Sequence, residues 1–244
     1  MSTVVLIHGA AMDSSVWRYQ AAALADAGFV PLAVDLPGHG TSEGEPSTTV
    51  GGYAGWLLAY LRMIGESVHL VGHSMGGLVA LASAAAEPER VRSVVLIGVA
   101  DPMAVNPDLL EGTKDGDLSM FPAMVGWMHA RDPIEVPEWT TQDTLEVILR
   151  AAPGVAHADL TACDTFGPVA PTAEKVAAPM CLILGEQDAM TRPARAAAIA
   201  DAAPHATTVI VEGAGHLVPV ERPGVVNEAL IGFLRAVEDG AKRR

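Results

Sequence analysis

The sequence predicts an α/β protein with a mainly parallel sheet covered by helices on both faces, and three observations support this prediction. Short apolar segments alternate with longer helical patterns along most of the 244 residues. Alternation of this kind implies right-handed crossovers, so the strands run parallel and helices cover both faces. Half of the residues are hydrophobic, which is enough to bury a sizeable core.

The individual elements follow from the apolar runs and the segments between them. Strands are expected near residues 3–8, 29–35, 67–72, 93–98, 179–185 and 206–211. Helices are expected near residues 16–27, 50–65, 75–87, 191–202 and 223–238. We expect six strands in the order 2-1-3-4-5-6. In this order the topology reverses beside the first strand, so a crevice forms between the carboxyl ends of the first and third strands.

The alternation stops after the fourth expected strand, where a segment rich in Met, Pro and acidic residues follows. We interpret residues 103–170 as a helical cap inserted into an α/β core of residues 1–102 and 171–244. The clearest cap helices are predicted at residues 121–131 and 141–152.

The second of these cap helices has a polar residue at its start that can act as N-cap. Thr140 or Thr141 fills that position, because a threonine hydroxyl can accept a hydrogen bond from a free N–H of the first turn.

A serine between glycines marks the end of the third expected strand. Ser74 lies in Gly-His-Ser-Met-Gly, residues 72–76, between an apolar strand-like run and small residues that predict a helix. A sharp strand-to-helix turn forces the serine into sparsely populated backbone space, so Gly72 and Gly76 avoid clashes of Cβ atoms. Because this motif also occurs by chance, its weight depends on a base, an acid and oxyanion donors elsewhere. Ser74 is the candidate nucleophile.

His216 is the candidate general base, because it follows the last expected strand in a glycine-rich loop from which it can reach into a cleft. His8 is expected to shape the loop after the first strand, and strand alternation is expected to point His73 away from Ser74. The other histidines are interpreted as turn, surface or core residues: His39, His69, His129, His157 and His205.

Asp188 is the candidate acid that orients the base, since it lies just beyond the carboxyl end of the fifth expected strand. A buried carboxylate there would hold the imidazole in the tautomer that accepts the serine proton. Glu186 and Asp101 are the alternatives, and Asp101 also follows a strand. The chain order Ser74, Asp188, His216 favours Asp188.

Two main-chain N–H groups are expected to form an oxyanion hole. Met75, directly after the nucleophile, supplies one, and Ala10 in the loop after the first strand supplies the other. Donors so placed stabilise the negative charge that develops on a substrate oxygen.

Taken together, these motifs resemble the α/β-hydrolase superfamily over most of the chain. The resemblance rests on residues 6–10, 35–42, 72–77, 185–188 and 213–223. With no strand before Val4, the chain is similar to the compact plant methylesterases and hydroxynitrile lyases, while the segment around His216 is similar to bacterial esterases and enol-lactonases. The resemblance implies an α/β-hydrolase fold and a serine esterase or lactonase activity that needs no cofactor and no metal.

Several other activities are alternatives to ester hydrolysis, and the residues favour some of them more than others. A serine at position 74 disfavours a haloalkane dehalogenase or an epoxide hydrolase, which have an aspartate there. Hydroxynitrile lyase activity is disfavoured by Gly9 and Leu217, where that group has threonine and lysine. A lactonase is the nearest alternative to a carboxylic ester hydrolase. A C–C bond hydrolase with the same triad and a non-catalytic small-molecule receptor stay open.

Apolar residues crowd the first predicted cap helix and could form the roof of a substrate pocket. Met120 and Trp127 are the candidate substrate-binding residues. The alternative is that these side chains attach the cap to the core, because methionine fills irregular gaps in any interface.

The charge and the composition limit the classes of partner that the protein is expected to bind. The net charge of −14 disfavours nucleic acid and anionic membranes, and no apolar stretch is long enough to span a bilayer. The two cysteines, Cys163 and Cys181, are expected to be reduced, and no basic leader precedes the first strand. We therefore expect a cytoplasmic enzyme for a small-molecule ester or lactone, with its oligomeric state left open.

Overall fold

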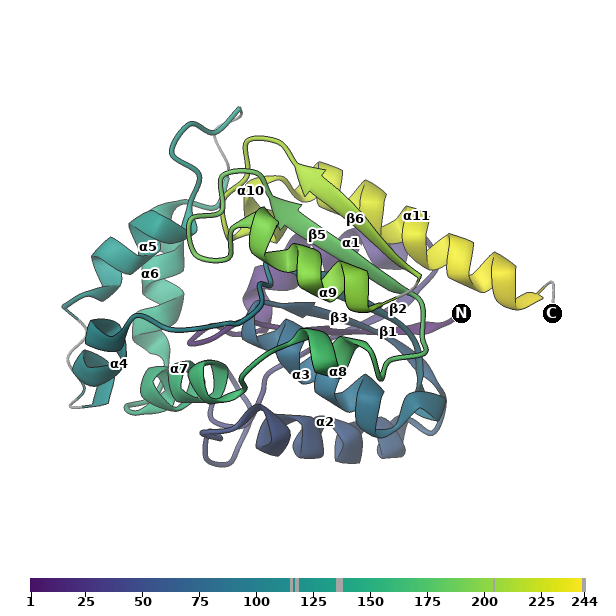
Figure 1. The fold of residues 1–244 in the computed structure, drawn as a ribbon, viewed down its shortest axis with the longest axis horizontal. Helices are drawn as coiled ribbons and strands as arrows, with labels where there is room; N and C mark the ends of the chain where they lie inside the picture. The colour runs from purple at the N-terminus through teal and green to yellow at the C-terminus, as the bar shows by residue number, and fades with distance from the viewer. Residues whose placement is uncertain (115, 117–118, 135–137, 204, 243–244) are drawn as a thin grey trace.

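Six parallel strands form the centre of the fold (Figure 1). The computed structural model describes residues 1–114, 116, 119–134, 138–203 and 205–242. The strand order is β2-β1-β3-β4-β5-β6, and every neighbouring pair is parallel, which confirms the predicted sheet. The strands are β1 (Thr3–Ile7), β2 (Val30–Val34), β3 (Val68–His73), β4 (Val91–Ile97), β5 (Met180–Gly185) and β6 (Ala206–Val211).

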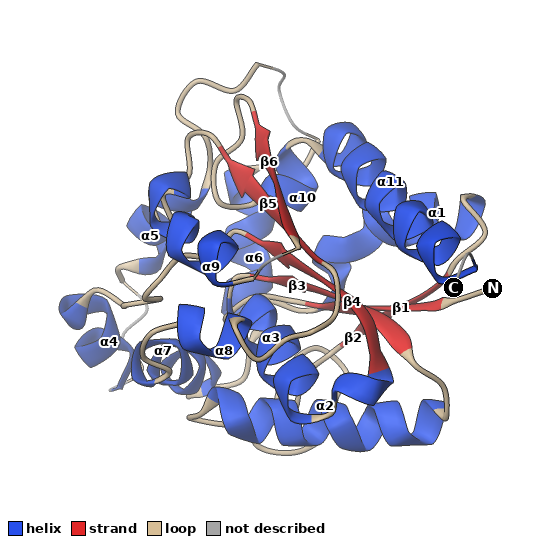
Figure 2. Ribbon diagram, turned by 45° about the vertical axis from the view of Figure 1, so that its right-hand side comes forward, coloured by secondary structure: helices blue, strands red, loops and turns tan. Residues whose placement is uncertain are grey.

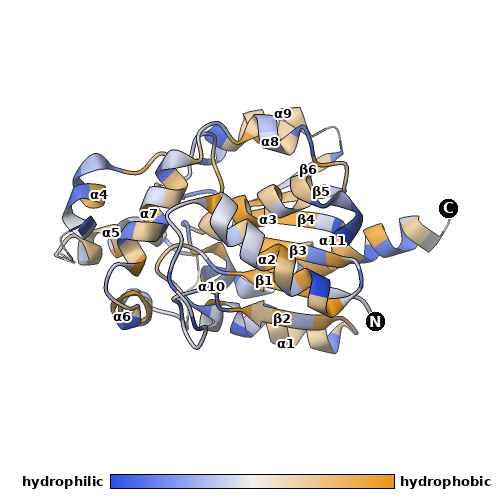
Figure 3. Cartoon of the chain, turned by 90° about the horizontal axis from the view of Figure 1, so that it is seen from below, coloured by the Kyte–Doolittle hydropathy of each residue, from blue (hydrophilic) through white to orange (hydrophobic). Residues whose placement is uncertain are grey.

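The burial of the inner strands explains why their sequences are mostly apolar. Every residue of β1, β3 and β5 is buried, whereas the edge strands β2 and β6 are partly exposed. Inner strands of a parallel sheet are covered on both faces, so polar alternation is lost there. Figure 3 shows the resulting hydrophobic colour of β1 and α3 and the mixed colours along α11.

Helices cover the two faces of the sheet and enclose a separate apolar core on each (Figure 2). One face carries α1 (Arg18–Asp26), α10 (Val218–Glu221) and α11 (Pro223–Lys242). The other face carries α2 (Val50–Ile64), α3 (Met75–Ala86), α8 (Ala170–Ala173) and α9 (Ala197–Ala202). Short 3₁₀ helices lie at Ser14–Trp17, Pro88–Arg90 and Pro193–Ala196.

Helix α2 shows how local sequence sets the bounds of a helix. The Thr49 side chain accepts a hydrogen bond from the Gly52 N–H and so caps the first turn. Gly65 ends the helix with a φ of 80°, a left-handed conformation that costs glycine little, and its N–H bonds the Leu61 carbonyl. The observed helix therefore matches the predicted one closely.

Besides α8, the described residues form four helices between β4 and β5, and these four gather at one end of the molecule, away from both termini (Figure 1). They are α4 (Pro107–Lys114), α5 (Phe121–Met128), α6 (Thr141–Arg150) and α7 (Val155–Thr165). Helices α5 and α6 confirm the predicted pair, and Thr140 caps α6 in a capping box with Asp143. Helices α4 and α7 were not predicted. The division into a cap at 103–170 and a core stays our interpretation of this arrangement.

We predict that Gly76→Ala destabilises the protein by about 2–3 kcal/mol, because an added methyl group has no space there. A Cβ at Gly76 would lie 2.2 Å from the Ile7 carbonyl oxygen, which belongs to the backbone of the central strand β1. Urea unfolding of wild type and variant measures the difference in the free energy of unfolding.

Gly55→Ala in α2 is the matched control, because a Cβ at that exposed helical position meets nothing within 4 Å. It is expected to raise stability by about 0.5–1 kcal/mol through the better helix propensity of alanine. Equal effects of the two substitutions would contradict the steric explanation.

Candidate active site

Ser74 occupies the sharp turn between β3 and α3 in a strained backbone conformation. Its φ is 52° and its ψ is −118°, values that a residue with a side chain rarely adopts. A Cβ at Gly72 would lie 2.1 Å from the Gly76 carbonyl oxygen, so the turn requires glycine on that side. The predicted role of both flanking glycines therefore has a direct steric basis.

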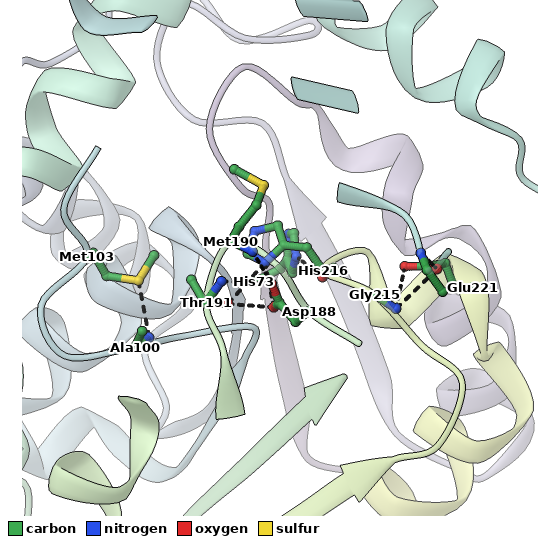
Figure 4. A network of polar contacts seen from close by, with 10 residues as sticks. His73, Ala100, Met103, Asp188, Met190, Thr191, Gly215, His216 and Glu221 are labelled. Carbon is green, nitrogen blue, oxygen red and sulfur yellow. Dashed lines mark hydrogen bonds and ion pairs between the residues drawn. The ribbon is translucent and has the colours of Figure 1, made fainter. Parts of the chain in front are cut away.

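Asp188 and His216 form a hydrogen-bonded pair beyond the ends of β5 and β6 (Figure 4). The Nδ1 of His216 lies 2.8 Å from the Asp188 Oδ2, and both side chains are buried. Because a carboxylate accepts hydrogen bonds, Nδ1 carries the proton and Nε2 is left as the basic nitrogen. This is the tautomer that a general base requires.

Sequence reasoning missed Thr191, which holds the Asp188 carboxylate. Its hydroxyl donates to Oδ2 at 2.5 Å, and its N–H donates to Oδ1 at 2.7 Å. The Met190 N–H adds a further bond to Oδ1 at 2.8 Å. An aspartate followed three residues later by threonine is typical of such local turns, and this spacing could have indicated the contact.

These donors fix the charge of Asp188. Burial by itself would raise the pKa of the carboxyl, but the charge and hydrogen bond of His216, together with the bonds from Thr191, outweigh it. The pKa of Asp188 is therefore lowered, and the pair holds a carboxylate beside an imidazole.

The two alternative acids, Asp101 and Glu186, bind backbone N–H groups elsewhere. The Asp101 carboxylate accepts the N–H groups of Val169 and Ala170, at 2.8 and 3.0 Å, at the start of α8. The Glu186 carboxylate accepts the Gly213 N–H at 3.1 Å. The structure thus brings Asp188 to His216 and engages both alternatives elsewhere.

His73 contributes to the site through contacts with His216, and the expectation that it points away from Ser74 stays a prediction. Its Nε2 donates to the His216 carbonyl oxygen at 2.9 Å, and the two rings lie 4.8 Å apart. Gly9 leaves space for this ring, because a Cβ at Gly9 would lie 2.8 Å from the His73 Nδ1. Burial and the nearby His216 lower the pKa of His73 to about 3, so the ring is neutral.

The two predicted oxyanion donors come from segments that lie against each other. Ile7 and Gly72 are register partners in the parallel β1–β3 pair, so the chain leaves both strands at the same level. A Cβ at Gly9 would lie 3.3 Å from the Ser74 Cβ. Ala10 follows in this loop and lines the same pocket as Ser74, whereas the Met75 side chain is fully buried in the core.

A pocket of about 280 Å³ opens between helices α4, α5 and α7 and the ends of the strands. Ser74 and His216 lie in its wall, which is otherwise mostly apolar and includes Met12, Met103, Leu109, Phe121, Met124, Trp127, Met128, Leu160, Cys163 and Met190. Of the two predicted substrate-binding residues, Trp127 lines the pocket and Met120 does not. Met120 precedes the first turn of α5 and packs against the apolar cluster instead.

The loop that carries His216 is bonded to the end of α5. The Met128 carbonyl oxygen accepts the N–H of His216 at 2.7 Å and that of Leu217 at 3.2 Å. Glu221 joins the same two segments, because its buried carboxylate accepts the N–H of Ala130 at 2.7 Å and that of Gly215 at 3.1 Å (Figure 4). Burial raises the pKa of Glu221, and these backbone donors partly offset the rise.

Comparison with known proteins agrees with this geometry. The chain belongs to the alpha/beta hydrolase family, whose model matches residues 4–229. It is similar to a thermophilic esterase from Thermogutta terrifontis solved with malate bound, with 25% identity, a TM-score of 0.87, and coverage of 97% of this chain and 90% of that one. An enol-lactonase from Burkholderia xenovorans has the same fold, with 24% identity, a TM-score of 0.86, and coverage of 96% and 91%.

A curated relative is longer than this chain. The dihydrolipoyllysine-residue acetyltransferase component of the acetoin cleaving system of Pseudomonas putida is 31% identical over 95% of this chain. The match covers 63% of that protein, so the chain spans less than two thirds of its length. Among the described residues, every helix is too short or too polar to cross a membrane.

We predict that the stability lost in Asp188→Asn depends on pH. The folded pKa of Asp188 lies below its ordinary value of 3.8. The ionised carboxylate therefore stabilises the fold above pH 3.8, and this contribution disappears as the pH falls through the folded pKa. Urea unfolding between about pH 6 and pH 3 should show the gap between wild type and variant shrinking in acid. Asp201→Asn, at an exposed position, is the control, and a gap that stays constant with pH would contradict the assignment.

We also predict that Glu221→Gln lowers the free energy of unfolding by about 1–3 kcal/mol, because the new amide places an N–H donor against backbone N–H donors. Thermal or urea unfolding measures the loss. Glu212→Gln, an exposed residue near the same loop, is expected to change stability by no more than about 0.5 kcal/mol. If the two variants behave alike, Glu221 does not hold the loop.

Proposed function

We propose that the protein is a serine hydrolase that cleaves a small-molecule carboxylic ester through an acyl-enzyme on Ser74. The observation that carries the proposal is the shared pocket of Ser74, in its strained turn, and His216, bonded to Asp188 at 2.8 Å. A nucleophile, a base and an acid that orients the base are the groups that acyl transfer requires.

In the proposed mechanism, the Ser74 oxygen attacks the ester carbonyl carbon while the His216 Nε2 takes the hydroxyl proton. The carbonyl electrons move onto oxygen, and the resulting oxyanion accepts hydrogen bonds from the Ala10 and Met75 N–H groups. His216 then gives its proton to the leaving alkoxide as the C–O bond breaks. Water, deprotonated by the same imidazole, hydrolyses the acyl-enzyme and regenerates Ser74. The scheme uses side chains and backbone groups of this chain alone.

The pocket supports a substrate with an apolar group of moderate size. Its wall contains five methionines, whose unbranched side chains adapt to ligands of differing shape. The similarity to the Thermogutta esterase also favours ester hydrolysis. Lactone opening uses the same steps, with a leaving alkoxide that stays attached to the acyl group, and it is the alternative we retain, along with C–C bond hydrolysis.

The test is hydrolysis of p-nitrophenyl esters from acetate to decanoate by wild type and Ser74→Ala. We expect wild-type turnover with an optimum set by the pocket, and a loss of roughly 10⁴-fold or more in kcat for the variant. Ser83→Ala is the matched control, because Ser83 lies buried on the same helix α3 but outside the pocket wall, and it should keep wild-type kcat.

Other outcomes would redirect the assignment. Equal rates in wild type and Ser74→Ala would exclude an acyl-enzyme on Ser74. Wild-type activity confined to lactones or vinylogous diketones would select one of the alternative hydrolases. Inertness toward all of these substrates, with tight binding of a small apolar molecule, would indicate a receptor.

A further inference from the structure

Asp159 is a fully buried acid on helix α7 that the proposed mechanism does not use. Its Oδ2 accepts the Ala11 N–H at 2.7 Å and faces the His39 Nε2 at 2.8 Å. Its Oδ1 accepts the Tyr53 hydroxyl at 2.5 Å. One cap carboxylate thus joins three segments of the core: the loop after β1, the turn after β2, and α2.

The partners of His39 show that Asp159 faces a cation. The His39 Nδ1 lies 3.0 Å from the Pro37 carbonyl oxygen, and its Nε2 lies 2.8 Å from the Asp159 carboxylate. Both nitrogens face acceptors, so both carry protons and the ring is an imidazolium. Burial lowers the pKa of His39, but the hydrogen bond and charge of Asp159 outweigh it, so the pKa is raised.

The neighbouring His8 carries no charge. Its Nδ1 donates to the Gly9 carbonyl at 2.9 Å, and its Nε2 accepts the Leu36 N–H at 3.1 Å, which defines a neutral tautomer. Burial, followed by the charge of His39, lowers the pKa of His8 to about 4. Asp159 and His39 therefore form a pair of one carboxylate and one imidazolium.

The bond to Ala11 holds the loop after β1, which carries the proposed oxyanion donor Ala10. Ala11 has a φ of 54°, an uncommon conformation for a residue with a side chain. The peptide that joins Ala10 to Ala11 carries this N–H, so the Asp159 carboxylate fixes the orientation of that peptide. The neighbouring peptide carries the Ala10 N–H, the proposed oxyanion donor. A donor must lie within a few tenths of an ångström of its best position to stabilise a transition state.

We propose that Asp159 is a positioning residue, which holds the Ala10 N–H in place through Ala11 and so makes the oxyanion hole depend on the docking of cap helix α7. This inference rests on the proposed function. Stability alone is a weak reason for such a pair, since apolar residues often replace a buried ion pair without loss. A positioning role explains why the carboxylate bonds a backbone N–H beside the oxyanion donor as well as its counterion.

The experiment compares wild type with Asp159→Leu, which removes every acceptor but keeps the number and branching of the side-chain heavy atoms. We expect kcat for a p-nitrophenyl ester to fall by about 10–100-fold while KM changes by less than about threefold. The inhibition constant of an alkyl trifluoromethyl ketone, whose adduct with Ser74 carries an oxyanion, should rise by the same factor as kcat falls. A merely structural role would not couple these two quantities.

Two further variants separate the contacts of Asp159. Asp159→Asn keeps an oxygen that can accept the Ala11 N–H, so it should retain kcat within about threefold. Tyr53→Phe removes one hydroxyl from the network but leaves the bond to Ala11, so it should also retain kcat. The proposal is overturned if folded Asp159→Leu keeps wild-type kcat and inhibition, or if Tyr53→Phe loses as much activity as Asp159→Leu.

A replacement variant and a labelling assay keep the test decisive. Near-ultraviolet circular dichroism shows whether Asp159→Leu folds. If it does not, Asp159→Glu takes its place, because the longer side chain keeps the charge but shifts the carboxylate away from Ala11. Wild-type kcat in Asp159→Glu would then overturn the proposal. Labelling of wild-type Ser74 by a fluorophosphonate is followed by mass spectrometry. Absence of labelling and of turnover in wild type would count against the proposed function, whereas equal labelling and turnover in wild type and Asp159→Leu would count against the role of Asp159 alone.

Discussion

The close approach of the loop after β1 to the first turn of α3 is the constraint on which the site depends. At Gly76 an added Cβ would lie 2.2 Å from the Ile7 carbonyl oxygen and 2.4 Å from that of His8. Only a residue without a side chain permits this contact, and the contact sets Ala10 beside Ser74. Because β1 and β3 are neighbours at the point where the strand order reverses, this approach occurs at the carboxyl edge of the sheet. The position of the pocket follows from it, and so does the place of the proposed acyl transfer.

Two buried carboxylates connect the segment between β4 and β5, which we interpret as a cap, to this arrangement. Glu221 bonds Ala130 after α5 and Gly215 before the base, and Asp159 of α7 bonds Ala11 beside the oxyanion loop. Both acids accept main-chain N–H groups and so fix backbone positions, and Asp159 also bonds the side chains of His39 and Tyr53. Burying such charges costs free energy that the bonds return only in part. Together they hold the segment between β4 and β5 against the loop of His216 and the loop of Ala10, at separate points.

The sequence predicted the parts of the site that lie next to glycines and strand ends, because those positions have steric requirements that a pattern can display. Ser74 and Asp188 are of this kind. Helix α7 escaped prediction because it starts after Gly154 without a side-chain cap. Asp159 in turn looks like any of the 29 acidic residues until the fold buries it. Met120 was assigned to the pocket because it lies next to the crowded apolar residues of the predicted helix. It precedes α5, however, whereas Met124 and Met128 inside the helix share the face that lines the pocket.

The charge states of the buried histidines are compatible with the proposed role of His216 as a base. The His73 ring lies 4.8 Å from that of His216, and a positive charge on His73 would oppose the proton that His216 takes from Ser74 in the proposed mechanism. Burial keeps His73 neutral, with a pKa of about 3, while its Nε2 bonds the His216 carbonyl. His39, by contrast, has a buried carboxylate partner and holds its charge away from the base. The protein thus places a neutral histidine against His216 and a charged one against α7. The imidazolium that the proposed mechanism forms at His216 would have Asp188 as its bonded counterion and a neutral ring as its neighbour.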